Sequence, residues 1–245
     1  MSDDQRETAE LRNRVAELEK ANKELSQFAY IVSHDLKAPL RAISNLSQWI
    51  EEDIEEHLND ENREQMDMLR GRVQRMQKMI DGILEFSRIG RVTQQSDKFL
   101  VADVLRDTLD ALDPPDGFSI DIPTSLPSVT GSKLRLQQVF SNLIGNAINH
   151  HDRIDGKITL SCKDAGEFYK FTISDNGPGI PKEYHEKIFM IFQTLQARDQ
   201  NESTGIGLSL VKKIVEEYGG NIALESDTGN GATFTFTWPK KIEME

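Results

Sequence analysis

The stretch FAYIVSHDLKAPLR, residues 28–41, predicts a long helix that carries an exposed histidine. Its apolar residues Ala29, Val32 and Leu36 follow one another in steps of three and four, which is the spacing of a helix seam. His34 then falls at the f position of the heptad, which points away from the seam toward solvent. The sequence therefore indicates a helix that presents His34 to whatever approaches from outside.

Two neighbours of His34 suggest chemistry. The carboxylate of Asp35 can take the proton from one imidazole nitrogen and leave the other free to attack, which is general-base activation of a nucleophile. The alternative is that Asp35 is only a surface charge. Pro39 has no N–H, so the carbonyl of Asp35 loses its helical partner and we expect a kink. Such a soft point would let the helices bend while a second domain docks at His34.

Toward the N-terminus the seam continues unbroken, and it comprises Leu11, Val15, Leu18, Asn22, Leu25, Ala29, Val32 and Leu36. A pattern sustained over this length favours a dimeric coiled coil over a solvent-exposed amphipathic helix. Asn22 is the one polar residue in the seam. A buried Asn there lowers stability but pairs with its counterpart across a dimer axis, which fixes the register.

Toward the C-terminus the pattern stops at residues 57–60, where we expect a turn. The four-three spacing resumes in a second helix at Leu69, Val73, Met76, Ile80 and Ile83. Two long helices joined by a short loop form an antiparallel hairpin, and two such hairpins from two chains form a four-helix bundle.

From about residue 91 the heptads end, and glycine, proline and serine become frequent. We expect a short strand and a helix over 99–112, helices over 131–150 and 204–218, and strands over 157–162, 168–174, 221–225 and 232–238. This order predicts a mixed sheet with helices on one face. The fold class is therefore α+β: a helical hairpin in a dimeric four-helix bundle with a coiled-coil extension, followed by an α/β sandwich. The expected domains are 1–25, 26–90 and 98–245.

The composition indicates which kinds of partner and which cellular compartment to expect. Lys and Arg total 29 and Asp and Glu total 41, so the net charge of −12 argues against nucleic acid as the main partner. Cys162 is the single cysteine, so no disulfide can form within the chain, which fits the cytoplasm. The acidic N-terminus has no apolar core of a signal peptide, and no run of about 18 apolar residues could span a membrane.

Four short motifs in the second half suit a nucleotide. Asn142 and Asn146 lie one helical turn apart, and amide oxygens are ligands that suit Mg²⁺. Asp175 follows a strand and precedes glycines, so its carboxylate can accept a hydrogen bond from an exocyclic amine such as that of adenine. The segment TGIGL, residues 204–208, opens a helix whose N-terminal amides favour phosphate. The turn GNG lies at 229–231. Each motif alone is ordinary turn chemistry, but their order and spacing point to one site.

These segments resemble a known family. NLIGNA, DNGPGI, TGIGL and GNGATFTF are similar to the N, G1, G2 and G3 boxes of the histidine-kinase ATPase domain, which shares its fold with gyrase B, Hsp90 and MutL. The segment IFMIF, residues 188–192, resembles the F box of histidine kinases, and residues 28–41 resemble their H box. The resemblance spans about residues 20–89 and 99–238.

The resemblance implies a set of ligands for ATP and Mg²⁺. It implies that Asn146 coordinates Mg²⁺, that Asn142 supports the phosphates and that Asp175 binds the adenine amine. The remaining residues assigned to the nucleotide are Gly177 and Gly179, which shape the pocket, Gly205 and Gly207, which meet the phosphates, and Thr233. Residues 193–203 would form a lid. The sequence departs from the family at Ser203, often Gly, and at Asn149, often Lys; Arg198 or His150 could supply the missing cation.

The expected activity is transfer of the γ-phosphoryl group of ATP to His34, with Asp35 as its base, and then to an aspartate in the receiver domain of a response regulator. The resemblance also implies a homodimer and an upstream sensor domain. Two alternatives remain: an ATPase of the gyrase B and Hsp90 group, which leaves the H and F boxes without a purpose, and a coiled-coil scaffold with a nucleotide-sensing module that no longer catalyses, which Asn149 favours.

Overall fold

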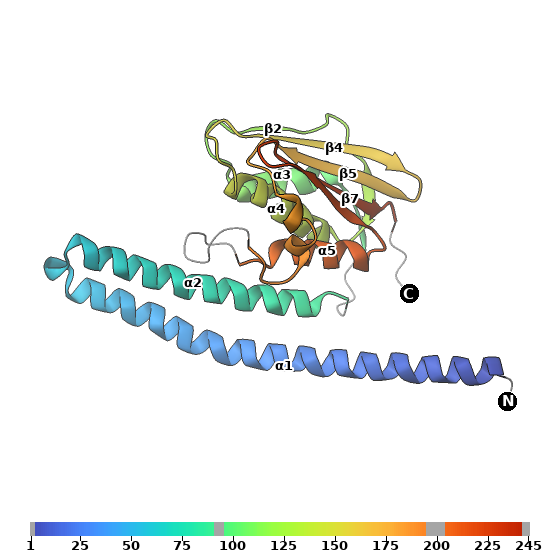
Figure 1. Cartoon of the computed structure of the whole chain (residues 1–245), viewed down its shortest axis with the longest axis horizontal. Helices are drawn as coiled ribbons and strands as arrows, with labels where there is room; N and C mark the ends of the chain where they lie inside the picture. Colours follow the sequence, from blue (N-terminus) through green and yellow to red (C-terminus); the bar gives the residue numbers. More distant parts are fainter. Residues whose placement is uncertain (1–2, 91–95, 195–203, 242–245) are drawn as a thin grey trace. The chain divides into compact units, whose positions relative to one another are not determined.

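The computed structural model describes residues 3–90, 96–194 and 204–241. The chain divides into two compact units, Met1–Arg88 and Ile89–Glu245, and each is described by itself (Figure 1).

The first unit is a helical hairpin. Helix α1 (Asp3–Asp53) is followed by a short 3₁₀ turn (Glu55–His57) and by helix α2 (Asp60–Arg88). The side chain of Asn59 accepts a hydrogen bond from the backbone N–H of Asn62 at 2.8 Å, so the residue before α2 caps it. Helix α1 remains continuous through Pro39, and Figure 1 shows it curved along its length.

The hairpin buries few apolar residues within one chain. Leu40 of α1 and Val73 and Ile80 of α2 are its buried core, and the polar residues buried with them are Ser33 and Ser47. These α1 positions are not the seam. The exposed apolar residues of α1 instead include the seam and its continuation in the same spacing: Leu11, Val15, Leu18, Leu25, Val32, Leu36, Ile43, Leu46 and Ile50. The structure describes the backbone of Asn22 but not its side chain.

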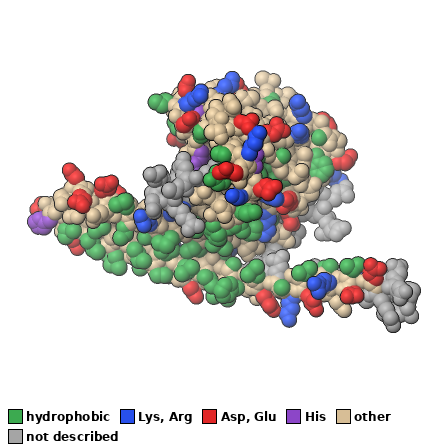
Figure 2. Space-filling view, viewed as in Figure 1, with side chains coloured by type: hydrophobic (Ala, Val, Ile, Leu, Met, Phe, Trp, Pro, Cys, Tyr) green, Lys and Arg blue, Asp and Glu red, His purple; other side chains and the backbone are tan. Residues whose placement is uncertain are grey.

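The apolar residues of helix α2 are likewise partly buried and partly exposed. Val73 and Ile80 are buried, whereas Leu69 and Met76, which belong to the same four-three series, are 40% and 43% exposed. Figure 2 shows hydrophobic side chains gathered along the hairpin. A single chain therefore leaves a continuous apolar surface on both helices, and such a surface marks an interaction site.

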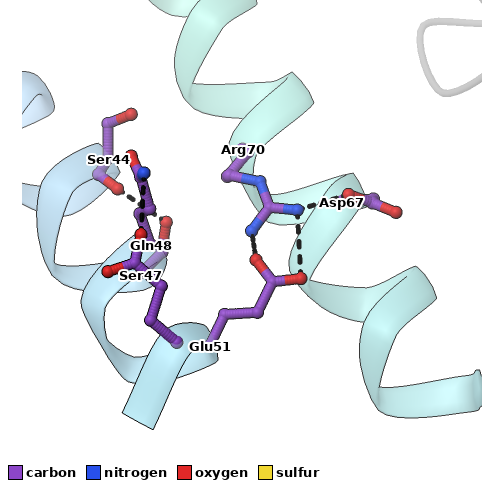
Figure 3. A network of polar contacts seen from close by, with 7 residues as sticks. Ser44, Ser47, Gln48, Glu51, Asp67 and Arg70 are labelled. Carbon is purple, nitrogen blue, oxygen red and sulfur yellow. Dashed lines mark hydrogen bonds and ion pairs between the residues drawn. The ribbon is translucent and has the colours of Figure 1, made fainter. Parts of the chain in front are cut away.

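Polar contacts fix the register of the hairpin near its turn (Figure 3). Arg70 of α2 binds Glu51 of α1 through both of its terminal nitrogens, the longer of the two contacts being 3.4 Å, and it also pairs with Asp67 one turn earlier. Further along the hairpin, Lys37 pairs with Asp81. A forked guanidinium–carboxylate pair that is partly buried has a defined geometry, so it specifies which turns of the two helices face each other.

The second unit begins with strand β1 (Asp97–Leu100), helix α3 (Val101–Leu112), strands β2 (Ser119–Asp121) and β3 (Ser128–Gly131) and helix α4 (Lys133–Asn149). It continues with β4 (Lys157–Ala165), β5 (Phe168–Asp175), two 3₁₀ turns (Lys182–Tyr184 and Lys187–Phe189), α5 (Gly207–Glu217), β6 (Ile222–Ser226) and β7 (Ala232–Pro239). The sequence did not predict β2 and β3.

Five strands form one mixed sheet in the order β2-β4-β5-β7-β6, with β2 parallel to β4 and the other pairs antiparallel. Strands β1 and β3 form a separate antiparallel pair. Helices α3, α4 and α5 cover one face of the sheet (Figure 1). Phe140 of α4 packs edge-on against Phe171 and Phe236 of the sheet, with ring centroids 5.5 and 5.6 Å away. This core packs α4 against β5 and β7.

Across the described residues, no helix combines the length and the apolar character that crossing a membrane requires.

Candidate functional site

Asp175 is the last residue of β5, and its carboxylate is oriented by backbone donors. Oδ1 accepts hydrogen bonds from the N–H groups of Gly177 at 2.9 Å and Ala232 at 3.2 Å. Within the described residues, Oδ2 has no such bond. One oxygen is thus anchored and the other is left to accept a hydrogen bond from a ligand, as an exocyclic amine would require.

Backbone hydrogen bonds connect the loop after Asp175 to the turn before β7. Gly231 donates to the carbonyl of Gly177 at 2.9 Å, and Gly229 donates to that of Pro178 at 2.6 Å. Gly179 adopts a left-handed φ of +70°, and a Cβ there would overlap the carbonyl of Asp227, so no other residue fits. Two motifs that lie about fifty residues apart in the sequence therefore form one structure.

Helix α4 carries the two amides, Asn142 and Asn146. Asn142 donates from Nδ2 to the carbonyl of Gln138 at 2.8 Å, which orients its Oδ1 outward. That oxygen faces Gly207, where a Cβ would lie only 2.5 Å from it. The carboxamide of Asn146 makes no hydrogen bond with the described residues, which leaves it available to a ligand.

Helix α5 begins at Gly207, three residues later than the sequence predicted, because Gly205 adopts a left-handed φ of +68° and turns the chain first. The carbonyl of Gly205 accepts a hydrogen bond from Phe192 at 2.8 Å. The N-cap residue of α5, Ile206, makes no side-chain capping hydrogen bond, so within the described residues the first amide groups beside Asn142 could receive an anion.

Amide oxygens and an open helix N-terminus fit Mg²⁺ bound to a phosphate chain. No group of three or more His, Cys, Asp or Glu side chains in the described part of the chain could form a metal cage. Mg²⁺ prefers one or two protein oxygens together with waters and substrate phosphates, so Asn146 and a nucleotide would suffice.

His34 lies in the other unit, on the exposed surface of α1. Its side chain is 76% exposed, and its Nδ1 lies 3.2 Å from Oδ1 of Asp35. An Nδ1–H that donates to this carboxylate leaves the lone pair of Nε2 pointing into solvent, as a nucleophile requires.

Two family models match the chain. The model of the His Kinase A (phospho-acceptor) domain matches residues 24–91, and that of the histidine kinase-, DNA gyrase B- and HSP90-like ATPase matches residues 131–242. This chain is the catalytic core of a sensor histidine kinase.

Individual proteins agree with this assignment. Cyanobacterial phytochrome B of Nostoc sp. is 40% identical over 226 residues, which are 90% of this chain and 30% of that protein. The structure of full-length ShkA in complex with AMPPNP has a TM-score of 0.66 at 23% identity and covers 89% of this chain and 47% of that one. Histidine kinase ThkA in complex with the response regulator protein TrrA has a TM-score of 0.61 at 25% identity, covering 92% and 66%. The chain spans about a third of the length of the first curated relatives that it matches.

Thr233 is placed differently from the other residues that the sequence assigned to ATP in this histidine kinase core. Its hydroxyl lies 2.9 Å from that of Ser174, whereas its neighbours Ala232 and Phe234 are buried, so they point to the opposite side of β7. The residue of this strand that reaches Asp175 is Ala232, through its backbone. A role for Thr233 in binding ATP therefore stays a prediction.

Two residues that bear on the cation that the family often has beside the phosphates, Asn149 and His150, lie in the described part of the chain. Asn149 is neutral and exposed. The ring of His150 is partly enclosed although the residue is exposed, and this desolvation lowers its pKa, which favours the neutral imidazole. Arg198, Ser203 and most of the expected lid lie outside the described residues.

Two histidines that contact the loop beginning at Asp175 carried no signal in the sequence. His185 donates from Nε2 to the carbonyl of Ile180 at 2.9 Å, which anchors the end of the loop that begins at Asp175. His151 bonds to Asn176 at the start of the same loop. A single histidine has no period or spacing, so only the folded chain could reveal these contacts.

Proposed function

We propose that this chain binds ATP with Mg²⁺ in the second unit, transfers the γ-phosphoryl group to His34 and passes it on to an aspartate in the receiver domain of a response regulator. The observation that carries the proposal is the pairing of Nδ1 of the exposed His34 with Asp35 in the same chain as an oriented carboxylate, Asp175. The family assignment supports both halves.

In the first step, Nε2 of His34 attacks the γ-phosphorus, a nitrogen–phosphorus bond forms, and the bond from phosphorus to the β,γ-bridging oxygen breaks with ADP as leaving group. The imidazole ring gains positive charge, and Asp35 stabilises the Nδ1–H or takes its proton. Asp175 holds the adenine, while Asn142 and the amides of α5 orient the phosphates. When bound by Asn146, Mg²⁺ supplies charge neutralisation on the phosphate oxygens.

In the second step, a carboxylate oxygen of the regulator attacks the phosphorus, and His34 leaves as neutral imidazole after Asp35 returns the proton. The ThkA structure was solved with a response regulator, which supports this class of partner. Because the curated relatives are about three times longer than this chain, we also propose that a sensor domain belongs to the complete protein. Residues 1–25 would serve as its linker, 26–90 as the phospho-acceptor domain and 98–245 as the ATPase domain.

The test is incubation with γ-labelled ATP and Mg²⁺, followed by a search for acid-labile, base-stable label on the protein. Label of this stability supports phosphohistidine. Release of free phosphate without labelled protein would support the ATPase alternative, and neither product would support a scaffold that only senses nucleotide.

We further propose that the chain is a homodimer whose two hairpins cover each other's exposed apolar surface. Ile43, which is 44% exposed in one chain, continues the seam. Ile43→Glu is expected to shift the dimer toward monomer at micromolar concentration, because it places a charge within the buried bundle.

Asn45→Glu is the matched control, since it introduces the same charge at an exposed position two residues away. Sedimentation velocity should show monomer for the first variant and dimer for the second. A dimer that tolerates Ile43→Glu at every concentration would place the interface elsewhere.

Ala38 leads to a further prediction, about the lifetime of the phosphorylated regulator. Many kinases of this family dephosphorylate their regulator with a Thr or Asn four residues after the phosphorylated histidine, one helical turn away. Ala38 occupies this position, and its methyl group cannot hold a water by a hydrogen bond. We expect a His34→Ala variant, which cannot take the phosphoryl group back, to leave the lifetime of the phosphorylated regulator unchanged.

Adding Ala38→Thr to that variant is expected to shorten the lifetime, because it returns a hydroxyl to the exposed surface of α1. The lifetime is followed by the decay of labelled regulator. If His34→Ala alone accelerates this decay by an order of magnitude, another side chain such as Asp35 or Lys37 orients the water.

A further inference from the structure

His151 is a buried polar residue with no assigned role. It follows α4 by two residues, and its side chain is 1% exposed. The ring of Phe118 packs edge-on against it at a centroid distance of 5.2 Å. A buried imidazole must satisfy both of its nitrogens or lose free energy, so its partners identify what it holds in place.

The partners of His151 determine its tautomer. Asn176 accepts a hydrogen bond on Oδ1 from the backbone N–H of Lys157 at 2.6 Å, which fixes the orientation of the amide. Nε2 of His151 lies 2.9 Å from the same oxygen and must therefore carry the hydrogen that it donates. Nδ1 is then the acceptor, and it receives the backbone N–H of Arg153 at 3.0 Å, while the carbonyl of the same residue lies 3.2 Å from it. The ring thus has a partner at both nitrogens.

These bonds connect the segment after α4 to the residue that follows Asp175. The backbone N–H of Asn176 also donates to the carbonyl of Lys157 at 3.2 Å, so its main chain and side chain are both held at the edge of β4. The ring of His151 packs against the next residue as well, because a Cβ on Gly177 would lie 3.4 Å from its Cδ2. Gly177 is the residue whose N–H anchors Oδ1 of Asp175.

We infer that His151 is a positioning residue for adenine recognition, which it controls by holding Asn176 and Gly177 so that the carboxylate of Asp175 meets the exocyclic amine. It does not touch the nucleotide. The inference rests on the proposed binding of ATP.

The test compares ATP with purine riboside triphosphate, which lacks the exocyclic amine, by calorimetric titration of the full chain with Mg²⁺. His151→Phe keeps a ring against Phe118 but removes both nitrogens. It is expected to weaken ATP binding roughly threefold to tenfold, the effect of one net hydrogen bond, and to leave the analogue nearly unaffected. A merely structural role would weaken both ligands equally.

Two matched variants separate the nitrogens. The amide nitrogen of Gln can reach the place of Nε2, so His151→Gln is expected to retain most of the affinity for ATP. His151→Asn can replace only the Nδ1 acceptor, so it is expected to behave like His151→Phe. Equal affinities of the His151→Gln and His151→Asn variants for ATP would contradict a role for the bond to Asn176. If the Phe variant does not fold, as judged by thermal melting, this Gln–Asn pair carries the test.

A double-mutant cycle distinguishes failure of this inference from failure of the proposed function. In an Asp175→Asn background, His151→Phe is expected to cause no further loss, because the group that it positions has been replaced. Full additivity would overturn the inference. If Asp175→Asn itself leaves the affinity for ATP unchanged, the adenine assignment fails instead, whatever His151 does.

Discussion

His34→Ala is expected to abolish labelling of the chain by γ-labelled ATP while nucleotide binding is retained. The substitution removes the nucleophilic nitrogen of the proposed reaction, and the exposed side chain contributes little to the packing of α1. Because alanine has the highest helix propensity, the helix itself should persist. The measurement is acid-labile label on the protein together with a calorimetric titration of ATP.

The matched control is His57→Ala, which removes an exposed histidine at the turn of the hairpin and should leave labelling intact. Label that persists on the His34→Ala variant would show that another residue accepts the phosphoryl group. Loss of both label and ATP binding would mean instead that the substitution disturbs more than the acceptor.

Asn146→Ala is expected to remove most of the Mg²⁺-dependent part of the affinity for ATP. A hydrogen bond or ligand contact to a charged group contributes about 1.5–3 kcal/mol, which corresponds to roughly a tenfold or larger loss. The carboxamide has no hydrogen bond within the described residues, so its removal should not disturb the folded unit. Titration of ATP with and without Mg²⁺ measures the effect directly.

Asn149→Ala is the control for this prediction. Asn149 is the last residue of the same helix, one turn further on, and it is exposed. The Asn149→Ala variant should bind ATP with the affinity of the unmodified chain, both with and without Mg²⁺. If the two variants behave alike, the position of the amide on α4 does not matter, and Asn146 is not the ligand of Mg²⁺.

The two-part architecture could be read from the sequence because each half has a local pattern. The four-three spacing from Leu11 to Leu36 predicts a helix wherever the chain places it, and the same spacing puts His34 outside the seam. Alternating residues in β4 and β5 likewise predicted strands. Strands β2 and β3, of three and four residues, were missed, because such short segments show little period and they acquire their pairing only from β4 and β1.

The tertiary structure decided which apolar residues of the hairpin are buried. Leu69, Val73, Met76 and Ile80 form one series in the sequence, yet only Val73 and Ile80 are buried within the chain. Spacing determines which residues share a broad apolar surface. It does not determine which part of that surface meets α1, since this depends on how the two helices are rotated and on pairs such as Arg70 with Glu51.

For the nucleotide motifs, the sequence likewise identified the residues, and the tertiary structure decided their contacts. The sequence by itself identified Asp175, the two amides of α4 and the glycines, because each belongs to a short segment with its own chemistry. Only the tertiary structure decided that the N–H of Ala232 anchors Asp175, that Asn142 faces Gly207, and that His151 holds the loop through Asn176. These contacts join residues that are 25 to 65 positions apart, and such bonds form only after the sheet and its helices have brought distant segments together.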